Sequence, residues 1–306
     1  MNQTRTLHGD IPRDGWVDRA LPGPVRPYAR LMRLDRPIGT WLLLLPCWWS
    51  IALAAGPDLA GQAGLVALFG VGAVVMRGAG CTYNDIVDRD FDARVARTAA
   101  RPIPSGAVTA RQATVFLGGL LLVGLLVLLP LDSFAIAVGV ASLPLVFTYP
   151  FMKRITYWPQ AWLGLTFNWG ALMGWAAVRG EIAAPAVTLY VAGLFWTLGY
   201  DTIYAHQDRE DDALIGVRST ALALGRRTRP AMALFYALAL GLTAVAGVQA
   251  GLGGVFLALL LPAAAQLAWQ VVAADIDDPA NCLAIFRSNR LYGWLVLAAI
   301  VAGGFA

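Results

Sequence analysis

The sequence predicts an all-α polytopic membrane protein, and three observations lead to that fold class. Hydrophobic residues make up 58% of the 306 residues, charged residues only 14%, and the mean hydropathy is +0.62. A soluble domain normally carries about 25% charged residues. Apolar stretches recur along the chain at the length of about 20 residues that a helix needs to cross ~30 Å of hydrocarbon. Lys and Arg gather in alternate connecting segments.

Nine apolar stretches are long enough to span a bilayer. In chain order they cover residues 38–56, 64–82, 113–130, 133–151, 161–178, 186–205, 232–250, 252–274 and 288–305. Only Pro130, Leu131 and Asp132 separate the third stretch from the fourth, which predicts a tight helical hairpin. We therefore expect nine transmembrane helices in one bundle, formed by residues 31–306, after a cytoplasmic N-terminal arm of residues 1–30.

The distribution of basic residues predicts the orientation of these helices. With the N-terminus inside, 21 of the 23 Lys and Arg residues fall in cytoplasmic segments. Arg179 lies in an external loop and Arg77 within a predicted helix. This bias is the positive-inside rule, so the net charge of +4 reflects topology and predicts no nucleic-acid partner. The arginines at the end of the arm and just after it, Arg26, Arg30, Arg33 and Arg36, are expected on anionic lipid.

Two acidic clusters hold nine of the 19 Asp and Glu residues. The first covers residues 84–92 at the end of the second predicted helix, and the other covers residues 201–212 at the end of the sixth. A basic and small-polar stretch follows each cluster, at 97–106 and 215–220. This matching layout predicts two pseudo-repeated halves whose clusters open on the cytoplasmic side and face each other across one cavity.

Each cluster has acids at helical spacing. On a continuous helix, one face would carry Asp85, Asp88 and Asp92, and another would carry Asp201, Asp208 and Asp212. Such carboxylates repel one another, and at a helix C-terminus the macrodipole disfavours them as well. Solvated polar caps are the plain interpretation of one such cluster. Two clusters at matching positions indicate instead that a bound divalent metal relieves both costs.

The ligand types indicate which metal and substrate such a site would take. Oxygen ligands without paired His or Cys suit Mg²⁺ or Mn²⁺. Mg²⁺ takes one or two carboxylates and completes its shell with water and phosphate oxygens. The clusters and the basic stretches therefore predict a diphosphate with a lipid tail, held through metal ions that neutralise the charge of the leaving diphosphate. A divalent-cation transporter is the alternative, but its ion sites would lie near the midplane on broken helices.

The residues of the two clusters resemble the signatures of the UbiA superfamily of intramembrane prenyltransferases. The first signature is Asn84-Asp85-x-x-Asp88-x-x-x-Asp92, and the second is Asp208-x-x-x-Asp212. Residues 35–39, 97–102, 149–160 and 201–208 are similar to the branch that acts on 4-hydroxybenzoate. The resemblance covers about residues 30–305.

The resemblance implies a nine-helix bundle with a cavity open to cytoplasm and lipid. Mg²⁺ would bind polyprenyl diphosphate through Asn84, Asp88, Asp92, Asp208 and Asp212, with Asp85 assisting from an outer shell. Departure of the diphosphate leaves an allylic cation, which the ring of 4-hydroxybenzoate attacks ortho to its hydroxyl, giving an early ubiquinone precursor. Another acceptor, such as a naphthoate, homogentisate or haem, is the alternative within the superfamily. We expect a bacterial or mitochondrial inner membrane, with the active site facing the cytoplasm.

Further polar residues are candidates for substrate contacts. Arg154, with Lys153 beside it, is expected to bind the benzoate carboxylate or the diphosphate, since Arg presents a planar fork. The other expected diphosphate contacts are Tyr204, Arg101, Arg218 and Ser219. Asn168 is expected to make a hydrogen bond between helices. His206 is a candidate for removing the ring proton, although a single His at a membrane edge is more typical of a surface residue.

Arg77 lies seven residues before Asn84, and Asp201 lies the same seven residues before Asp208, which places each about 10 Å deeper along a helix. One alternative is a structural ion pair between these two residues. In the other, Arg77 meets an anionic substrate while Asp201 orients the phenol or a metal-bound water. A charge at that depth is too costly to be without a role.

Overall fold

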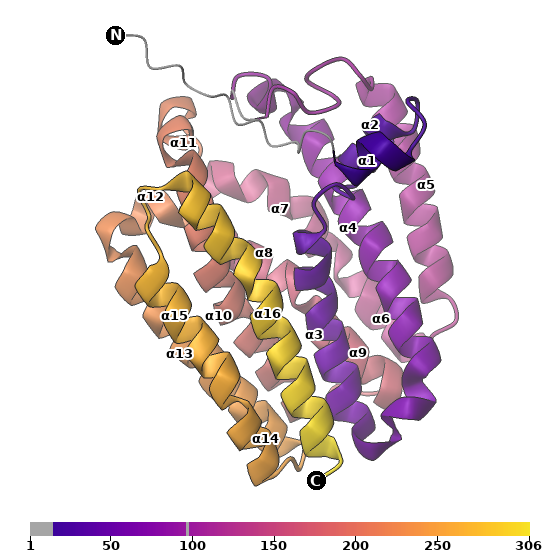
Figure 1. Cartoon of the computed structure of the whole chain (residues 1–306). Helices are drawn as coiled ribbons and strands as arrows, with labels where there is room; N and C mark the ends of the chain where they lie inside the picture. Colours follow the sequence, from indigo (N-terminus) through magenta and orange to yellow (C-terminus); the bar gives the residue numbers. More distant parts are fainter. Residues whose placement is uncertain (1–14, 96–97) are drawn as a thin grey trace. The chain divides into compact units, whose positions relative to one another are not determined.

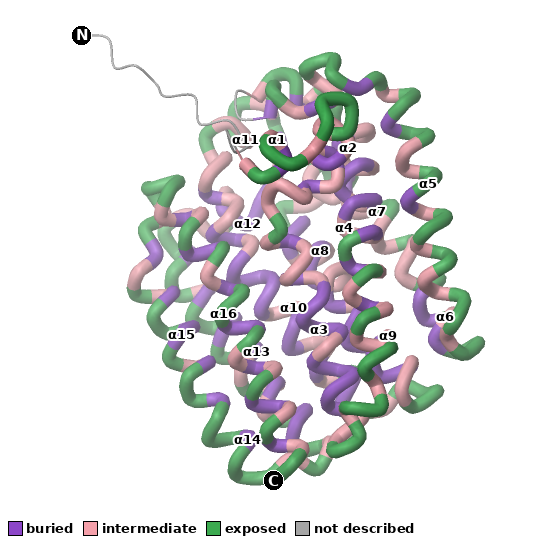
Figure 2. Tube along the Cα trace, turned by 45° about the vertical axis from the view of Figure 1, so that its right-hand side comes forward, coloured by how far each residue is buried: buried purple, intermediate pink, exposed green. Residues whose placement is uncertain are grey.

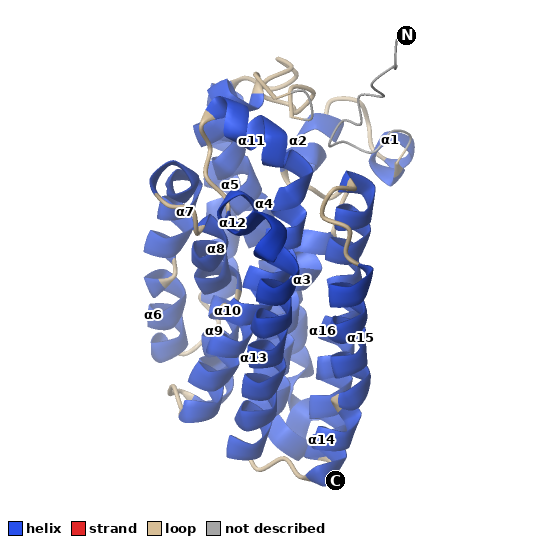
Figure 3. Cartoon of the chain, turned by 90° about the vertical axis from the view of Figure 1, so that its left-hand side faces the viewer, coloured by secondary structure: helices blue, strands red, loops and turns tan. Residues whose placement is uncertain are grey.

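The computed structural model describes residues 15–95 and 98–306 of the chain. Residues 1–14 of the predicted arm and Arg97 of the first basic stretch lie outside the described residues. Within the described residues every element of regular structure is a helix (Figure 3). Five helical stretches in them are long and apolar enough to cross a membrane. The predicted all-α membrane fold is confirmed.

The chain forms two compact units. The first consists of the described residues up to Thr40 together with Val71–Val127, and the second of Trp41–Gly70 together with Leu128–Ala306. The boundaries between the units fall within α3 (Ile38–Ala55), within α4 (Ala63–Asp92) and at the last residue of α5 (Ala110–Leu128). The grouping of residues 31–306 into one nine-helix bundle of two pseudo-repeated halves stays a prediction.

The first unit is built around α4 and α5 (Ala110–Leu128), which lie side by side (Figure 1). Val75 of α4 packs there against Leu120 of α5. Two short helices, α1 (Trp16–Ala20) and α2 (Arg26–Leu31), precede α3, and Leu31 packs against Ala113 of α5. Much of α5 is apolar and exposed (Figure 2), as a lipid-facing helix would be.

The second unit contains most of α3 and the remaining helices. In chain order these are η1 (Gly56–Gln62), α6 (Ser133–Ala141), α7 (Leu143–Ile155), α8 (Pro159–Phe167), α9 (Trp169–Arg179), α10 (Ala184–Ala205), η2 (His206–Asp208), α11 (Arg209–Ile215), α12 (Thr220–Leu224), η3 (Gly225–Arg227), α13 (Thr228–Gln249), α14 (Gly254–Leu259), α15 (Leu261–Ala273) and α16 (Pro279–Gly304). Helix α10 packs against α8, α9, α13 and α16, so it forms the core of this unit (Figure 1).

Three of the predicted spans are each divided into two helices. The breaks fall at Ser142, Asn168 and Leu260. Pro144 and Pro262 lie in the first turn after two of these breaks, and proline has no N–H to bond the preceding turn. Each predicted span falls on a helix or on such a divided pair, with α4 continuing past residue 82 to Asp92. The number of nine crossings stays a prediction.

A buried polar network joins four helices of the second unit. Asn289 of α16 accepts a hydrogen bond from Trp196 Nε1 of α10 at 2.8 Å. Asn289 and Gln270 of α15 exchange two hydrogen bonds, at 3.1 and 3.2 Å. Tyr236 of α13 donates to Gln270 Oε1 at 2.7 Å. Because hydrocarbon offers polar groups no water, these bonds specify how α10, α13, α15 and α16 pack together.

The predicted interhelical role of Asn168 is confirmed. Its Nδ2 donates to Thr197 Oγ1 of α10 at 2.8 Å. A Cβ at Gly193 would lie 2.0 Å from Asn168 Oδ1, so glycine at that position leaves room for the amide. The bond attaches the junction of α8 and α9 to the core helix α10.

We expect Asn289→Leu to lower the thermal midpoint of the detergent-solubilised protein. The change leaves the Trp196 N–H and the Gln270 amide without their buried partner, which costs about 1–3 kcal/mol. Gln249→Leu is the matched control, because Gln249 is exposed at the end of α13. Equal thermal midpoints for the two variants would show that the network contributes nothing to stability.

Candidate active site

The first acidic cluster lies on the last turns of α4. Asp85, Asp88 and Asp92 are buried, whereas Arg89 and Asp90 between them are exposed. The predicted one-sided stripe of carboxylates is therefore confirmed for this cluster. The stripe is at the C-terminal end of the helix, where the macrodipole favours cations. The stripe consequently needs positive charge close to it.

Two arginines of the first unit supply that charge. Arg33 Nη2 donates to Asp85 Oδ1 at 2.6 Å. Arg101 Nη1 lies 3.3 Å from the same oxygen and 2.8 Å from Asp92 Oδ2. The Asp85 side chain is 0% exposed, and those of Arg33 and Arg101 are 9% and 11% exposed. The expectation that Arg33 lies on lipid is wrong, because burial of Asp85 draws its guanidinium inward.

The backbone of Arg33 lies in the left-handed region, with φ of 58°, and among the described residues no other non-glycine has a positive φ. The Arg33 N–H donates to the Arg30 carbonyl and the Leu34 N–H to the Ala29 carbonyl, both at 3.0 Å. This pair of bonds is the Schellman motif, whose left-handed residue is usually glycine. A side chain at this position costs about 1–2 kcal/mol. Nothing in the local sequence marks the conformation.

The second acidic cluster does not lie on one continuous helix. Helix α10 ends at Ala205, η2 follows, and α11 begins at Arg209. The expected common helix face of Asp201, Asp208 and Asp212 is therefore wrong, because helical spacing does not hold across this break. Asp208 is the N-cap residue of α11, where the macrodipole favours negative charge. For Asp208 the dipole is therefore favourable, unlike for the acids of the first cluster.

Two of the predicted substrate-binding segments are held together in the second unit. The Arg218 N–H donates to the Lys153 carbonyl at 2.8 Å, and Arg218 Nη1 donates to the Ile155 carbonyl at 2.5 Å. The Arg218 guanidinium also lies over the Tyr157 ring, 5.3 Å from its centroid. These contacts bring the basic residues after α11 next to those at the end of α7.

Lys153 and Arg154 follow the predicted span of residues 133–151, but they are helical, because α7 continues to Ile155 and contains both in its last turn. Cations are favoured there by the macrodipole. Ser219 is buried and is the N-cap of α12, where its Oγ accepts the Leu222 N–H at 3.4 Å. Substrate binding by Lys153, Arg154 and Ser219 stays a prediction.

The candidates that lie deeper are on α4 and α10. A Cβ at Gly39 would lie 2.5 Å from Arg77 Nε, so the glycine of the 35–39 segment lets the guanidinium approach the backbone. Asp201 and Tyr204 are on α10, and the Tyr204 ring centroid is 4.4 Å from that of Phe286 on α16. Arg77 belongs to the first unit and Asp201 to the second, and both alternatives for this pair stay predictions.

His206 is buried, so the expectation of a surface residue is wrong. Its Nε2 lies 2.9 Å from Thr228 Oγ1 of α13. Burial, assisted by the nearby Arg209 charge, lowers the pKa of His206 to about 4. The imidazole is therefore neutral at pH 7 and contacts the start of α13.

The donor atoms of the clusters fit Mg²⁺ in their chemistry. Among the described residues no three His, Cys, Asp or Glu side chains form a ready-made metal cluster. Mg²⁺ needs no such cluster, because it usually takes one or two carboxylates and completes its shell with water and phosphate oxygens. Asn84 and Asp88, one helical turn apart on α4, are of the required amide and carboxylate type.

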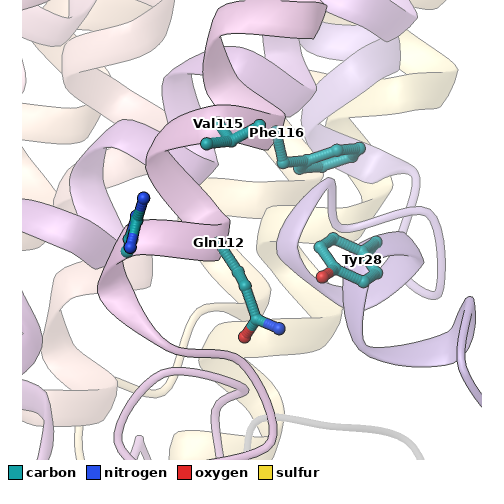
Figure 4. Close-up of a pocket in the computed structure, with 5 residues that line it drawn as sticks. Tyr28, Gln112, Val115 and Phe116 are labelled. Atoms are coloured by element: carbon teal, nitrogen blue, oxygen red, sulfur yellow. The ribbon is translucent and has the colours of Figure 1, made fainter.

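An open pocket of about 510 Å³ lies in the first unit, beside α2 and the start of α5 (Figure 4). Tyr28, Arg111, Gln112, Val115 and Phe116 line it. The Tyr28 and Phe116 rings meet edge to face, with centroids 5.0 Å apart. The lining contains none of the predicted site residues, so this pocket is separate from the acidic stripe.

Known proteins resemble this chain over most of its length. A mitochondrial 4-hydroxybenzoate polyprenyltransferase from Arabidopsis thaliana is 52% identical over 289 residues, which cover 94% of this chain and 71% of that protein. The UbiA prenyltransferase family matches residues 43–303, a range that contains both acidic clusters.

Solved structures resemble the chain in fold. An apo UbiA homolog from Aeropyrum pernix K1 has a TM-score of 0.73 at 24% identity, covering 86% of this chain and 97% of that one. A UbiA homolog from Archaeoglobus fulgidus bound to GPP and Mg²⁺ has a TM-score of 0.66 at 17% identity, covering 92% and 100%. By its sequence as well as its fold, the chain belongs to the UbiA prenyltransferase family.

Proposed function

We propose that the chain is a 4-hydroxybenzoate polyprenyltransferase. It moves a polyprenyl group from polyprenyl diphosphate to the ring carbon ortho to the hydroxyl of 4-hydroxybenzoate, in ubiquinone biosynthesis. The observation that carries the proposal is the 52% identity, over 94% of the chain, with the Arabidopsis enzyme of that name. The carbon–oxygen bond to diphosphate breaks, a carbon–carbon bond forms to the ring, and the ring loses a proton.

The two acidic signatures bind the diphosphate through Mg²⁺. When bound by Asn84, Asp88, Asp92, Asp208 and Asp212, Mg²⁺ neutralises the negative charge that develops on the departing diphosphate. These residues share oxygen donors of the kind that Mg²⁺ accepts. The solved homolog of the same fold was bound to GPP and Mg²⁺, which supports the use of a prenyl diphosphate with Mg²⁺ by this chain.

The basic residues at the end of α7 bind the aromatic acid. Arg154 takes the benzoate carboxylate through its planar guanidinium, with Lys153 beside it. Arg218 supports this end of α7 through its hydrogen bonds to the Lys153 and Ile155 carbonyls. Holding both reactants in place contributes to the rate, because it makes the encounter effectively unimolecular.

The protein is integral to the membrane, and we place its active site on the cytoplasmic face of a bacterial inner membrane, or in the mitochondrial inner membrane of a eukaryote. The positive-inside distribution of 21 of the 23 Lys and Arg residues supports this orientation. A site at the membrane edge also suits the two substrates, because one is a lipid diphosphate and the other a water-soluble acid.

The proposal is tested with purified protein, Mg²⁺, geranyl or longer prenyl diphosphate and labelled 4-hydroxybenzoate. We expect prenylated acid and released diphosphate in the complete mixture and none without the divalent cation. A product formed only from homogentisate or a naphthoate would move the chain to another acceptor class. Metal flux into liposomes without any prenylated product would favour the transporter alternative.

Asp88→Asn and Asp208→Asn are each expected to lower turnover by about 100-fold or more, because each removes a charged metal ligand of the proposed site. Membrane expression should stay at the wild-type level. Asp90→Asn and Glu210→Gln are the matched controls, because both side chains are exposed on the same segments. Full turnover in Asp88→Asn and Asp208→Asn would show that neither aspartate is a ligand of the metal.

Arg154→Ala is expected to raise the KM for 4-hydroxybenzoate by about tenfold, because the variant loses one charge-assisted hydrogen bond to the carboxylate. We expect a smaller change in kcat. Steady-state kinetics with each substrate varied in turn measure this effect. The control is Arg179→Ala, which removes an exposed arginine from the last turn of α9. A selective rise in the KM for the prenyl diphosphate would reassign Arg154 to that substrate.

A further inference from the structure

A chain of alternating charges runs along the first acidic signature. Arg33 Nη2 bonds Asp85 Oδ1, Arg101 Nη1 lies near the same oxygen, and Arg101 Nη1 also bonds Asp92 Oδ2, at 2.6, 3.3 and 2.8 Å. Asp85 is therefore linked to Asp92 through one guanidinium. Two positive and two negative charges balance in this group, all with little exposure to solvent.

Asp85 is fully buried, as Asp88 is. The Asp85 Oδ1 atom receives two arginines, Arg33 at 2.6 Å and Arg101 at 3.3 Å. A carboxylate whose burial is balanced by arginines is a fixed structural anion, and removing one partner leaves a buried charge uncompensated. Its position beside Asn84 in the signature does not by itself make it a ligand.

The backbone of Arg33 supports a role for its side chain. Glycine would end α2 in the same Schellman motif without strain, because it adopts φ of 58° freely. Ending the helix therefore does not require arginine. What arginine adds at this position is the guanidinium that reaches Asp85, 52 residues away in sequence.

We propose that Arg33 is a positioning residue of the metal site. By fixing Asp85, Arg33 makes that carboxylate an anchor for Arg101, and Arg101 in turn orients the carboxylate of Asp92. Asp85 is then a support for the site and not a metal ligand. Because Arg101 has Asp85 as a second partner, it keeps its place when Asp92 binds a cation. This inference rests on the proposed prenyl transfer for the part that concerns Mg²⁺.

The test uses the full-length protein with Arg33→Gly, Asp85→Asn and the two changes combined. Glycine relieves the strained backbone at this position, so the Arg33→Gly protein is suited to fold while it lacks the Arg33 side chain and its guanidinium. Arg30→Ala is the matched control, because Arg30 on α2 pairs with Asp18 and not with the signature. The Mg²⁺ concentration that half-saturates the protein is measured in two ways, by turnover and by the thermal shift with geranyl diphosphate in the absence of any aromatic acid.

We expect Arg33→Gly and Asp85→Asn each to raise the half-saturating Mg²⁺ concentration about tenfold, as losses of outer-shell support do. The double variant should be no worse than Arg33→Gly, since both changes break the same contact, and Arg30→Ala should match the wild type. If the half-saturating Mg²⁺ concentration of the double variant rose about 100-fold, the two effects would be independent and the proposal would be overturned. A loss in Asp85→Asn as large as that in Asp88→Asn would also overturn it, because Asp85 would then be a ligand.

The thermal midpoints separate this inference from the proposed function. If the wild type makes no prenylated acid, the proposed function fails, but the pairing is still tested by stability without Mg²⁺. Non-additive changes in thermal midpoint for Arg33→Gly and Asp85→Asn are expected from the ion pair. Strictly additive changes would show that the two residues do not act together, whatever the reaction.

Discussion

The cost of burying carboxylates at the end of an apolar helix governs the first unit. Helix α4 has Asp85, Asp88 and Asp92 on its buried side, where water is excluded and the macrodipole adds to their repulsion. An ion in such a place costs several kcal/mol unless it is paired. Arg33 and Arg101 provide partners for two of the three acids, and the chain accepts a left-handed arginine to deliver one of them. The ion pair with Asp85 thus offsets the strained backbone of Arg33, in the segment between α2 and α3.

The second unit gives the remaining candidate residues a rigid support. Asp201 and Tyr204 are on α10, which packs against α8, α9, α13 and α16. The hydrogen bonds that Trp196 donates to Asn289 and that Thr197 accepts from Asn168 hold α10 to its neighbours in surroundings that offer polar groups no alternative partner. A functional group on such a helix keeps its orientation better than one on a loop. The break after Ala205 then allows the acids that follow to leave the direction of α10.

The sequence predicts those features that local rules determine. The spans follow from the length of each apolar stretch against the thickness of the bilayer. The one-sided stripe on α4 follows from the helical period. Each of these features depends only on residues that are close in sequence. No local signal indicates the break at residues 206–208, because this segment contains neither Gly nor Pro. The pair of Arg33 with Asp85 joins residues 52 positions apart, and the contact of Arg218 with the end of α7 joins residues 63 apart. Only tertiary packing brings such residues together, so no pattern along the chain indicates them.

The arginine-balanced stripe also bears on how the proposed metal site is completed. Among the described residues no three acidic, His or Cys side chains form a metal cluster, and two of the α4 acids bond arginines. Mg²⁺ binds weakly to one or two carboxylates alone and strongly when a diphosphate supplies further oxygens. A site of this kind takes up its metal together with its substrate. Until then, Arg33 and Arg101 balance the charges of Asp85 and Asp92.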